Sequence, residues 1–551
     1  MQERKAKATR TEAREAPRAV LDAAHTGDIK GALGTLRVGT ERPRSLRQRL
    51  LAMAAIVGPG IIVMVGDNDA GGVATYSQAG QTYGTSLLWV LLLLIPVLIV
   101  NQEMVVRLGA VTGMGHGKMI FERFGKFWGA FSVGDLFLLN FLTLVTEFIG
   151  VSLAMGYFGI TPYISVPLTA LLLVGVTASG SFARWERAML IFIVANFLVI
   201  PLAILSHPHL GTVARDFVIP GVRGGLSNNS VFLIIAIVGT TVAPWQLFFQ
   251  QSNIVDKRIT PRWITYERVD TVVGSFVTVL GAGALMVTCA YAFGHASGPV
   301  PFTDAQGVAR GLMRYLGGAA GAMYAVVLLN ASLIGAAALS IATSYAVGDT
   351  FGVRHSLHWT FGEARAFYLT FTGIVLCAAL IVLIPGAPLG LITTAVQAMA
   401  GVLLPSASVF LLLLCNDKAV LGPWVNRLWV NALAAVIISA LLMLSAILTV
   451  TTIFPGVNVT ALLVGLSSFF AVCLVAGGAV VLVQGRRRDR ARGSQVSRQH
   501  RETWTMPPSA LLERPPESAL RTIALWAMWI YLAFSVVMLL VKAIQIATGH
   551  G

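Results

Sequence analysis

The chain has 551 residues, of which 56% are hydrophobic and only 12% are charged, and its formal net charge at pH 7 is +15. Soluble proteins carry about twice that charged fraction, so the composition excludes a soluble globular protein. Apolar runs of roughly 20 residues, long enough to cross the hydrocarbon core of a bilayer, recur along almost the whole chain. The sequence therefore predicts an all-α, polytopic membrane protein.

The hydropathy pattern predicts about 13 membrane spans. In chain order they cover residues 51–76, 86–108, 130–156, 161–180, 187–206, 229–252, 271–293, 320–348, 366–384, 390–415, 427–451, 459–484 and 522–546. The last segment follows a long polar stretch, and a helix lying along the membrane interface is the alternative interpretation of it. Residues 1–50 are polar, basic and without the apolar core of a signal peptide, so we expect a cytoplasmic N-terminal tail there.

Lysine and arginine are concentrated in the first fifty residues, in alternate short loops and in the run RRRDRAR at 486–492. This alternation follows the positive-inside rule and predicts a protein of the plasma (inner) membrane with its N-terminus in the cytoplasm. Topology and attraction to anionic lipid account for the positive charge. We therefore expect the lipid bilayer, and no nucleic acid, as a partner.

Residues 66–72, GDNDAGG, interrupt the first span with two carboxylates and three glycines. Ionisable groups at membrane depth are costly, and they usually face a cavity that carries ions or substrate. Unwound backbone at that depth is tolerated where it is buried in protein or lines such a cavity. The interruption therefore predicts one half of a metal-ion site in a secondary transporter, with Asp69 as its main ligand.

The sixth span is interrupted as well, at residues 239–246, GTTVAPWQ. Pro244 lacks a backbone N–H and clashes with the preceding turn, which breaks or kinks a helix. The first and sixth spans each open a block of five spans, and inverted repeats with discontinuous helices build midplane sites in many secondary transporters. We expect the carbonyl oxygens released near Gly66 and Thr240 to point into the site.

This symmetry predicts two inverted five-helix repeats in a LeuT-like arrangement that works by alternating access. The first repeat is expected at 51–206 and the second at 229–415. Two additional spans at 427–484, a basic cytoplasmic linker at 485–521 and a last span at 522–546 complete the expected organisation.

Six stretches between residues 50 and 450 share the pattern of one transporter family. They are residues 58–84, 86–90, 107–113, 147–150, 239–246 and 397–405. Together they resemble the Nramp divalent-metal transporters, and the changes from that pattern at Gly72 and Ala243 resemble the Nramp-related magnesium transporter branch. The resemblance implies a transporter of divalent cations with its metal site at the two interruptions.

Both interruptions depart from the Nramp pattern. The first-helix signature of the family is Asp-Pro-Gly-Asn, whereas Asp69 is followed here by Ala70-Gly71-Gly72, so that Gly72 stands where the family has an amide ligand. The sixth helix of the family has Met-Pro-His, and here Ala243 replaces the methionine. A methionine sulfur is a soft ligand, and its loss removes the donor that suits transition metals over hard ions.

Every remaining candidate ligand is an oxygen. The candidates are the Asp69 and Asp67 carboxylates, backbone carbonyls near Gly66 and Thr240, and the Gln246 amide. Asp67 has a second interpretation, in which it draws cations into the vestibule. Oxygen ligands suit hard cations, and Mg²⁺ keeps part of its water shell. We expect Gly72 and Ala243 to widen the cavity for a partly hydrated ion, so the resemblance implies import of Mg²⁺ and also of Mn²⁺.

The proton-handling residues of the family are changed too. Leu144 stands where the family has an acidic residue, three places before Glu147, and Trp245 replaces the sixth-helix histidine. Buried acid and histidine chains act as proton relays, so their loss implies uncoupled transport. Glu147 has two interpretations, an accessory role in transport or an internal pair. Glu103 precedes Arg107 by four residues, the spacing of an ion pair on one helix face.

The sequence contains no nucleotide-binding loop, catalytic triad or haem signature, so we expect no enzymatic activity, no cofactor and no required protein partner. Three alternatives stay open. The nearest is a proton-coupled Mn²⁺/Fe²⁺ importer of the ordinary Nramp type. The others are a Na⁺-coupled amino-acid transporter and a membrane receptor or scaffold, which unlike a transporter should not depend on Asp69.

Overall fold

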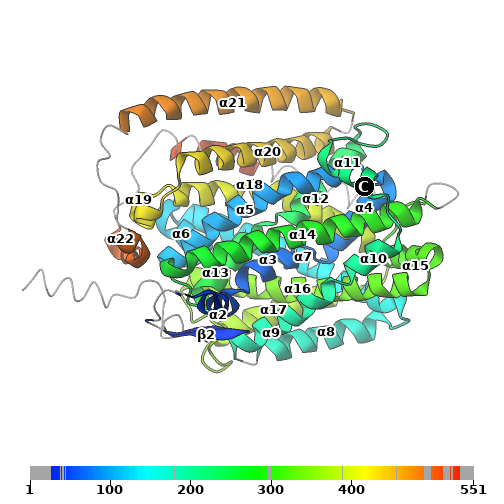
Figure 1. Cartoon of the computed structure of the whole chain (residues 1–551), viewed down its shortest axis with the longest axis horizontal. Helices are drawn as coiled ribbons and strands as arrows, with labels where there is room; N and C mark the ends of the chain where they lie inside the picture. The colour runs from blue at the N-terminus through cyan, green and yellow to red at the C-terminus, as the bar shows by residue number, and fades with distance from the viewer. Residues whose placement is uncertain are drawn as a thin grey trace, which may run out of the picture.

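The computed structural model describes residues 27–37, 39, 43, 45–178, 180–295, 300–386, 389–454, 456–488, 498–512, 521–522 and 525–533. The described chain forms a bundle of long helices that run between two ends (Figure 1). A short antiparallel hairpin, β1 (Ile29–Gly31) and β2 (Gly34–Leu36), packs at one of these ends. The bundle itself is entirely helical, as predicted, and the hairpin is the one exception among the described residues.

The first half of the bundle begins with an interrupted span. This span consists of α2 (Leu46–Ile56), α3 (Pro59–Gly66) and α4 (Ala70–Tyr83). It is followed by α5 (Leu88–Thr112), α6 (His116–Phe124), α7 (Lys126–Tyr157), α8 (Pro162–Thr177), α9 (Phe182–Asn196), α10 (Val199–Leu205) and α11 (Leu210–Val218). Pro59 opens α3 at a position where a missing N–H is harmless, and Gly113 ends α5 in the left-handed conformation that favours glycine.

The second half repeats this plan. It consists of α12 (Asn228–Thr241), α13 (Pro244–Asp256), the 3₁₀ turn η2 (Pro261–Trp263), α14 (Ile264–Phe293), α15 (Ala305–Leu316), α16 (Gly318–Phe351), α17 (Arg365–Val382) and α18 (Leu389–Cys415). Ser227 caps α12 by accepting a hydrogen bond from the Ser230 amide at 3.2 Å. Pro244 is the first residue of α13, so the proline that ends one half-helix begins the next.

The C-terminal part adds helices at one edge of the bundle (Figure 1). They are α19 (Lys418–Leu421), η3 (Gly422–Trp424), α20 (Leu428–Ile453), α21 (Val459–Arg488), α22 (Arg498–Thr503) and η5 (Ser509–Leu511). α20 packs against α18, and α21 packs against α20. Residues 525–533 of the last predicted span are helical, whereas 534–546 and, in the basic linker, 489–497 and 513–520 lie outside the described residues.

Within the described residues, ten helical segments are long and apolar enough to cross a membrane, and the bent pair of α2 and α3 adds an eleventh. The difference from about 13 predicted spans has two sources. α8 is apolar but has only 16 residues, and the segment at 522–546 is only partly described. The additional helices α20 and α21 are both among the segments long enough to span.

The two interrupted spans lie side by side at the centre of the bundle. α3 packs against α13 and α4 packs against α12, while α14, α16 and α18 contact these half-helices from outside. The second half of each interrupted span therefore meets the first half of the other, as expected for inverted repeats. This pairing brings the two interruptions together.

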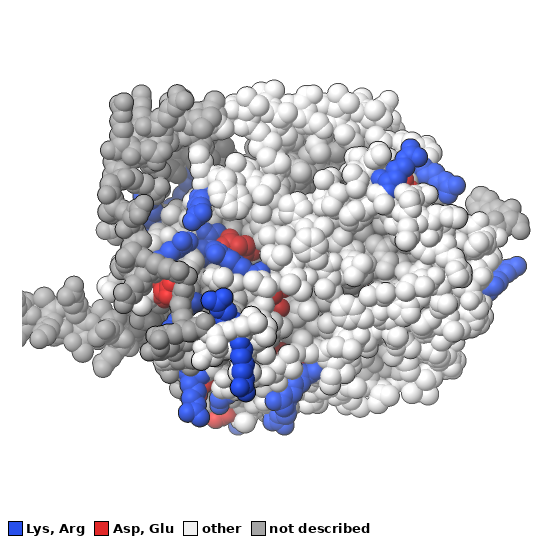
Figure 2. Space-filling model, viewed as in Figure 1, with Lys and Arg blue, Asp and Glu red and all other residues white. Residues whose placement is uncertain are grey.

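Basic side chains mark one end of the bundle. Figure 2 shows Lys and Arg gathered, together with acidic side chains, at the end that carries α2, α6 and α22 in Figure 1, with a smaller group at the opposite end. We call the former the basic end. The hairpin packs on α2 there and buries Ile29 and Ala32. Within the predicted tail at 1–50, residues 29–36 form this hairpin, and α2 begins at Leu46.

Candidate metal-ion site

The interruption of the first span places Asp69 at the start of α4. Asp69 is the N-cap of this helix, and its Oδ1 accepts a hydrogen bond of 2.6 Å from the Gly72 amide. In a continuous helix the Ala70 amide would donate to the Gly66 carbonyl. Here it donates to Oε2 of Glu147, on α7, at 3.1 Å. The Gly66 carbonyl therefore loses its helical partner.

The interruption of the sixth span has a comparable effect on Thr240. Pro244 has no N–H, so it cannot donate to the Thr240 carbonyl, which lies four residues earlier. Ala243 is the N-cap of α13 and has extended backbone, and its own carbonyl accepts from the Gln246 amide at 3.2 Å. The interruptions thus release the Gly66 and Thr240 carbonyls from the helical pattern.

Gln246 connects the two interruptions through its side chain. Its Nε2 donates to Asp67 Oδ1 and also to the Thr241 carbonyl, the latter at 3.1 Å. Its Oε1 accepts from Nε2 of Gln102, on α5, at 3.0 Å. The amide therefore orients Asp67 and joins the break after α3 to α5 and α13.

Four oxygen-bearing side chains surround the break before α4. The Asp69 carboxylate interacts with those of Asp67 and Glu147 and with the Thr240 hydroxyl. All four side chains are buried, and the most exposed of them, Asp69, is only 2% exposed. Asp67 Oδ2 and Glu147 Oε1 have no hydrogen-bond partner among the described residues. A cation among these oxygens would offset the repulsion and the desolvation of the neighbouring carboxylates.

The acidic side chains cannot form a metal site by themselves. Across the described part of the chain, no three His, Cys, Asp or Glu side chains converge closely enough to hold a metal ion. A cation beside Asp69 would therefore take one or two carboxylates together with carbonyl, hydroxyl or amide oxygens and retained water. Carboxylate, carbonyl and water oxygens are ligands that hard cations take in proteins.

The site is closed in this conformation, and Gly72 adds no free space to it. A Cβ atom at Gly72 would lie 2.8 Å from the Asp67 carbonyl oxygen and 3.1 Å from Thr240 Oγ1. A Cβ atom at Gly66 would lie 3.2 Å from the ring of Trp245. The expectation that Gly72 widens the cavity is therefore wrong for this conformation, because the Asp67 backbone and the Thr240 side chain fill the volume beside it.

No sulfur replaces the missing methionine at position 243. Ala243 is buried at the start of α13 and offers only a methyl group. Met64 lies three residues before Asp67, but its Sδ accepts a hydrogen bond of 3.6 Å from Ser275 on α14. The candidate ligands that the two interruptions bring together among the described residues are accordingly oxygens.

Two glutamines near the site were missed by the sequence analysis. Gln102 holds the amide of Gln246, as described above. Gln397, on α18, packs so closely on Gly71 that a Cβ there would overlap with its side chain, and its Nε2 is buried without a partner. Both are amides inside apolar spans, and this was the signal that could have identified them.

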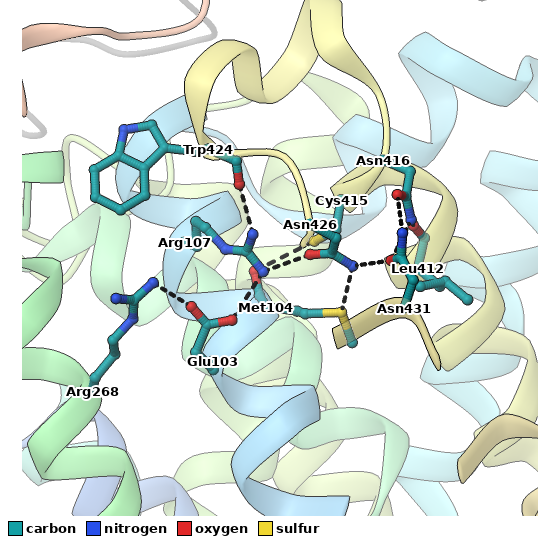
Figure 3. A network of polar contacts seen from close by, with 10 residues as sticks. All are labelled: Glu103, Met104, Arg107, Arg268, Leu412, Cys415, Asn416, Trp424, Asn426 and Asn431. Carbon is teal, nitrogen blue, oxygen red and sulfur yellow. Dashed lines mark hydrogen bonds and ion pairs between the residues drawn. The ribbon is translucent and has the colours of Figure 1, made fainter. Parts of the chain in front are cut away.

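Glu103 belongs to a separate polar network at the basic end (Figure 3). Its Oε2 pairs with Arg107 at 2.9 Å, and its Oε1 pairs with Arg268 of α14 at 2.5 Å. Arg107 also donates to the Trp424 carbonyl at 2.6 Å. The predicted ion pair between Glu103 and Arg107 is confirmed, and its role is to join α5 to α14 and to the turn before α20.

The chain matches a family of known proteins over most of its length. Residues 60–451 match the family described as natural resistance-associated macrophage protein-like, or Nramp. The divalent metal cation transporter MntH of Ralstonia nicotianae is 30% identical over 408 residues, which cover 71% of this chain and 88% of the relative. MntH of Aeromonas hydrophila is 26% identical over 415 residues, covering 72% of this chain and 96% of the relative.

Solved structures share the fold. The manganese transporter of Eremococcus coleocola, in complex with an aromatic bis-isothiourea compound, aligns with a TM-score of 0.60 and 20% identity over 82% of this chain and 98% of that chain. The fold is the LeuT-like arrangement of two inverted five-helix repeats with interrupted first and sixth helices, which confirms the predicted fold class. With the family match covering residues 60–451, the chain belongs to the Nramp family.

Proposed function

We propose that this protein imports divalent cations, chiefly Mg²⁺ and also Mn²⁺, by uncoupled alternating access. The observation that carries the proposal is the buried Asp69 carboxylate beside released carbonyls, with Ala243 where a sulfur ligand would lie. An oxygen shell without sulfur favours hard cations over soft ones. The broader class, a transported divalent metal, is supported by relatives named divalent metal cation transporters and by a structural neighbour named a manganese transporter.

Two buried side chains support the absence of proton coupling. Leu144 and Trp245 are both at most 1% exposed and stand where the family resemblance places proton-handling groups. Neither side chain can exchange a proton near neutral pH. The membrane potential can drive entry instead, since it favours a divalent cation by about 4.6 kcal/mol per 100 mV. By the positive-inside rule the basic end faces the cytoplasm, and the transported ion is the substrate, so we propose no resident cofactor.

A second candidate function is proton-coupled import of Mn²⁺ or Fe²⁺, and Glu147 favours it. Its carboxylate lies beside Asp69, one oxygen accepts from the Ala70 amide and the other has no partner. A buried acid in that position could accept a proton when the metal leaves. The two candidates differ in two observables, which are uptake of Mg²⁺ and acidification of the compartment that receives the metal.

Uptake into proteoliposomes separates the two candidates. The full-length protein is reconstituted at a set membrane potential, and internal Mg²⁺ or Mn²⁺ is recorded together with an internal pH dye. We expect saturable Mg²⁺ uptake without acidification, abolished in Asp69→Ala. Glu122→Gln is the matched control, because Glu122 is a carboxylate outside the site, paired with Lys118 at 3.4 Å. Mn²⁺ uptake with acidification and without Mg²⁺ uptake would establish the second candidate, and unchanged flux in Asp69→Ala would exclude this site altogether.

A further inference from the structure

A second buried cluster of charges lies at the bend between α2 and α3, at the basic end. The two helices meet at 50°, and Gly58 at the bend has φ of 152°, which L side chains rarely adopt. A Cβ atom at Gly58 would lie 2.0 Å from Glu186 Oε1 and 3.0 Å from Lys257 Nζ. The bend is therefore closed tightly around one acidic and one basic side chain.

The Lys257 ammonium occupies this bend in the way that a bound cation would. It donates to the Ile56 carbonyl at 2.7 Å, to the Val57 carbonyl at 2.9 Å and to Glu186 Oε1 at 2.6 Å. These contacts use all three N–H groups of the ammonium, and the side chain is fully buried. Two carbonyls and one carboxylate, from α2, the bend and α9, thus surround the positive charge of the Lys257 side chain.

Asp270, on α14, completes the bend with a negative charge. In a straight helix the Gly60 and Ile61 amides would donate to the Ile56 and Val57 carbonyls. Here both amides donate to Asp270 Oδ2, at 2.8 and 3.3 Å. Two helical hydrogen bonds are therefore missing at the bend. Lys257 donates to the two carbonyls that they leave, and Asp270 accepts from the two amides.

The hairpin holds Glu186 in position from the other side. The Ala32 amide, in the turn between β1 and β2, donates to Glu186 Oε2 at 2.5 Å, and the Ala32 carbonyl accepts from Arg187 Nε at 2.9 Å. α2 has few other anchors, since its buried residues are Ala52, Ala55 and Ile56. Its attachment to the bundle therefore depends largely on the hairpin and on Lys257.

Lys257 also interacts with further carboxyl groups of this cluster. Glu267, one turn before Asp270 on α14, interacts electrostatically with Lys257, Glu186 and Asp270. Both Glu267 oxygens are buried and have no hydrogen-bond partner among the described residues. Lys257 thus lies near three buried carboxyl groups, and its nitrogen is 2.6 Å from the nearest carboxyl oxygen, Glu186 Oε1. Without it, the carboxylates and the two carbonyls would be left without a positive partner, which is costly inside a protein.

We propose that Lys257 is a positioning residue for transport: its ammonium is a tethered cation that holds α2 docked in the closed conformation and releases the Ile56 and Val57 carbonyls when the basic end opens. The proposal rests on the proposed transport function, because opening of one end is a step of alternating access. It implies that a free ammonium ion can replace the side chain.

Chemical rescue of Lys257→Ala tests the proposal in the full-length protein. The docking of α2 is read from Ala52→Cys, whose site is fully buried, in a background where the exposed Cys377 and Cys473 are serine. We expect Lys257→Ala to raise the rate of maleimide labelling in detergent, and to lower Mg²⁺ uptake, by at least about tenfold. Propylammonium should reverse both effects because it restores the lost chain and its N–H donors. Tetramethylammonium, which has no N–H, should not.

Two further variants keep the test decisive. Lys118→Ala removes a partly exposed lysine of α6 and should leave labelling and uptake unchanged. If Lys257→Ala does not fold, Glu186→Gln serves instead, because it keeps an acceptor for Lys257 but removes the negative charge, and it should raise labelling by a smaller factor. Unchanged labelling in a folded Lys257→Ala or Glu186→Gln would overturn the proposal. Equal rescue by propylammonium and tetramethylammonium would overturn it as well.

The failure of the proposed function is distinguishable from the failure of this inference. If the wild-type protein shows no Mg²⁺ uptake but Lys257→Ala still undocks α2 and propylammonium restores the docking, then the tethered cation stands and the assigned substrate is wrong. If Mg²⁺ uptake is normal in wild type and labelling does not respond to Lys257→Ala, then the assigned substrate stands and the tethered cation is wrong.

Discussion

The side-chain amide of Gln246 donates a hydrogen bond to the Asp67 carboxylate and so links the interruption of the sixth helix to that of the first. Gln102 holds the oxygen of the same amide at 3.0 Å. Asp67 is therefore oriented before any ion arrives, and its second oxygen, Oδ2, is left without a partner. An ion that binds Asp69 would find this second carboxylate already in place, which lowers the cost of assembling the ligand shell.

Ala243→Met should shift the metal preference. The substitution places a thioether at the start of α13, beside the interruption, and a soft ligand favours Mn²⁺ and Cd²⁺ over Mg²⁺. We expect the ratio of Mn²⁺ to Mg²⁺ uptake to rise by at least about tenfold, which corresponds to about 1.4 kcal/mol of differential binding. Ala243→Leu is the control, because leucine has a similar volume and no sulfur. An equal change in both variants would show that bulk at position 243, and not sulfur, sets the preference.

Glu147→Gln should leave Mg²⁺ uptake largely intact if transport is uncoupled. The glutamine retains an oxygen that can accept from the Ala70 amide, as Glu147 does at 3.1 Å, so the local structure should persist. The measurement is the initial rate of Mg²⁺ uptake at fixed potential between about pH 6 and about pH 8. A large loss of uptake, or a pH dependence that disappears in Glu147→Gln, would instead assign proton transfer to this residue.

Gly72→Ala should impair transport because the closed site has no room for a Cβ atom. Such an atom would lie 2.8 Å from the Asp67 carbonyl oxygen, and overpacking of this kind costs about 1–3 kcal/mol. We expect the rate of Mg²⁺ uptake to fall by about tenfold or more. Gly134→Ala, on α7, is the matched control, since a Cβ there meets nothing within 4 Å. Equal rates in the two variants would mean that the closed conformation is not part of the transport cycle.

The loop between α16 and α17 should make stability depend on pH. Burial lowers the pKa of His355, but the Asp349 carboxylate, with Nε2 and Oδ1 3.3 Å apart, outweighs this and raises the pKa to about 9. Because the folded pKa exceeds the ordinary value of 6.5, this stabilisation is complete below about pH 6.5 and is lost as the pH rises through about 9.

Thermal unfolding checks this expectation. The unfolding midpoint of the wild type should fall between about pH 6.5 and about pH 9, and His355→Gln should be less stable at the lower pH and show a flatter curve. His295→Gln, at an exposed position before the loop to α15, should follow the wild type. A midpoint that rises over this interval in both the wild type and His295→Gln would contradict the assigned ion pair.

Local properties of the chain were sufficient to predict the helices and their two interruptions. The missing N–H of Pro244 and the acidic residues Asp67 and Asp69 in an apolar run act on their own helix, so they can be recognised without knowing what lies beside them. The pairing of the interrupted first and sixth spans also followed from their matching places in two blocks of five. The hairpin at 29–36 was missed because its strands have three residues each and show no clear periodicity.

Contacts between distant residues decided what the local pattern could not. Glu147 accepts from Ala70 across 77 residues, Gln246 donates to Asp67 across 179, and Lys257 donates to Ile56 across 201. Which polar group satisfies each break depends on where three or four helices pack together, and a one-dimensional pattern does not contain that information. The same reason explains the error at Gly72: a small side chain opens a cavity only if its neighbours do not close on it, and here the Asp67 backbone and the Thr240 side chain do so.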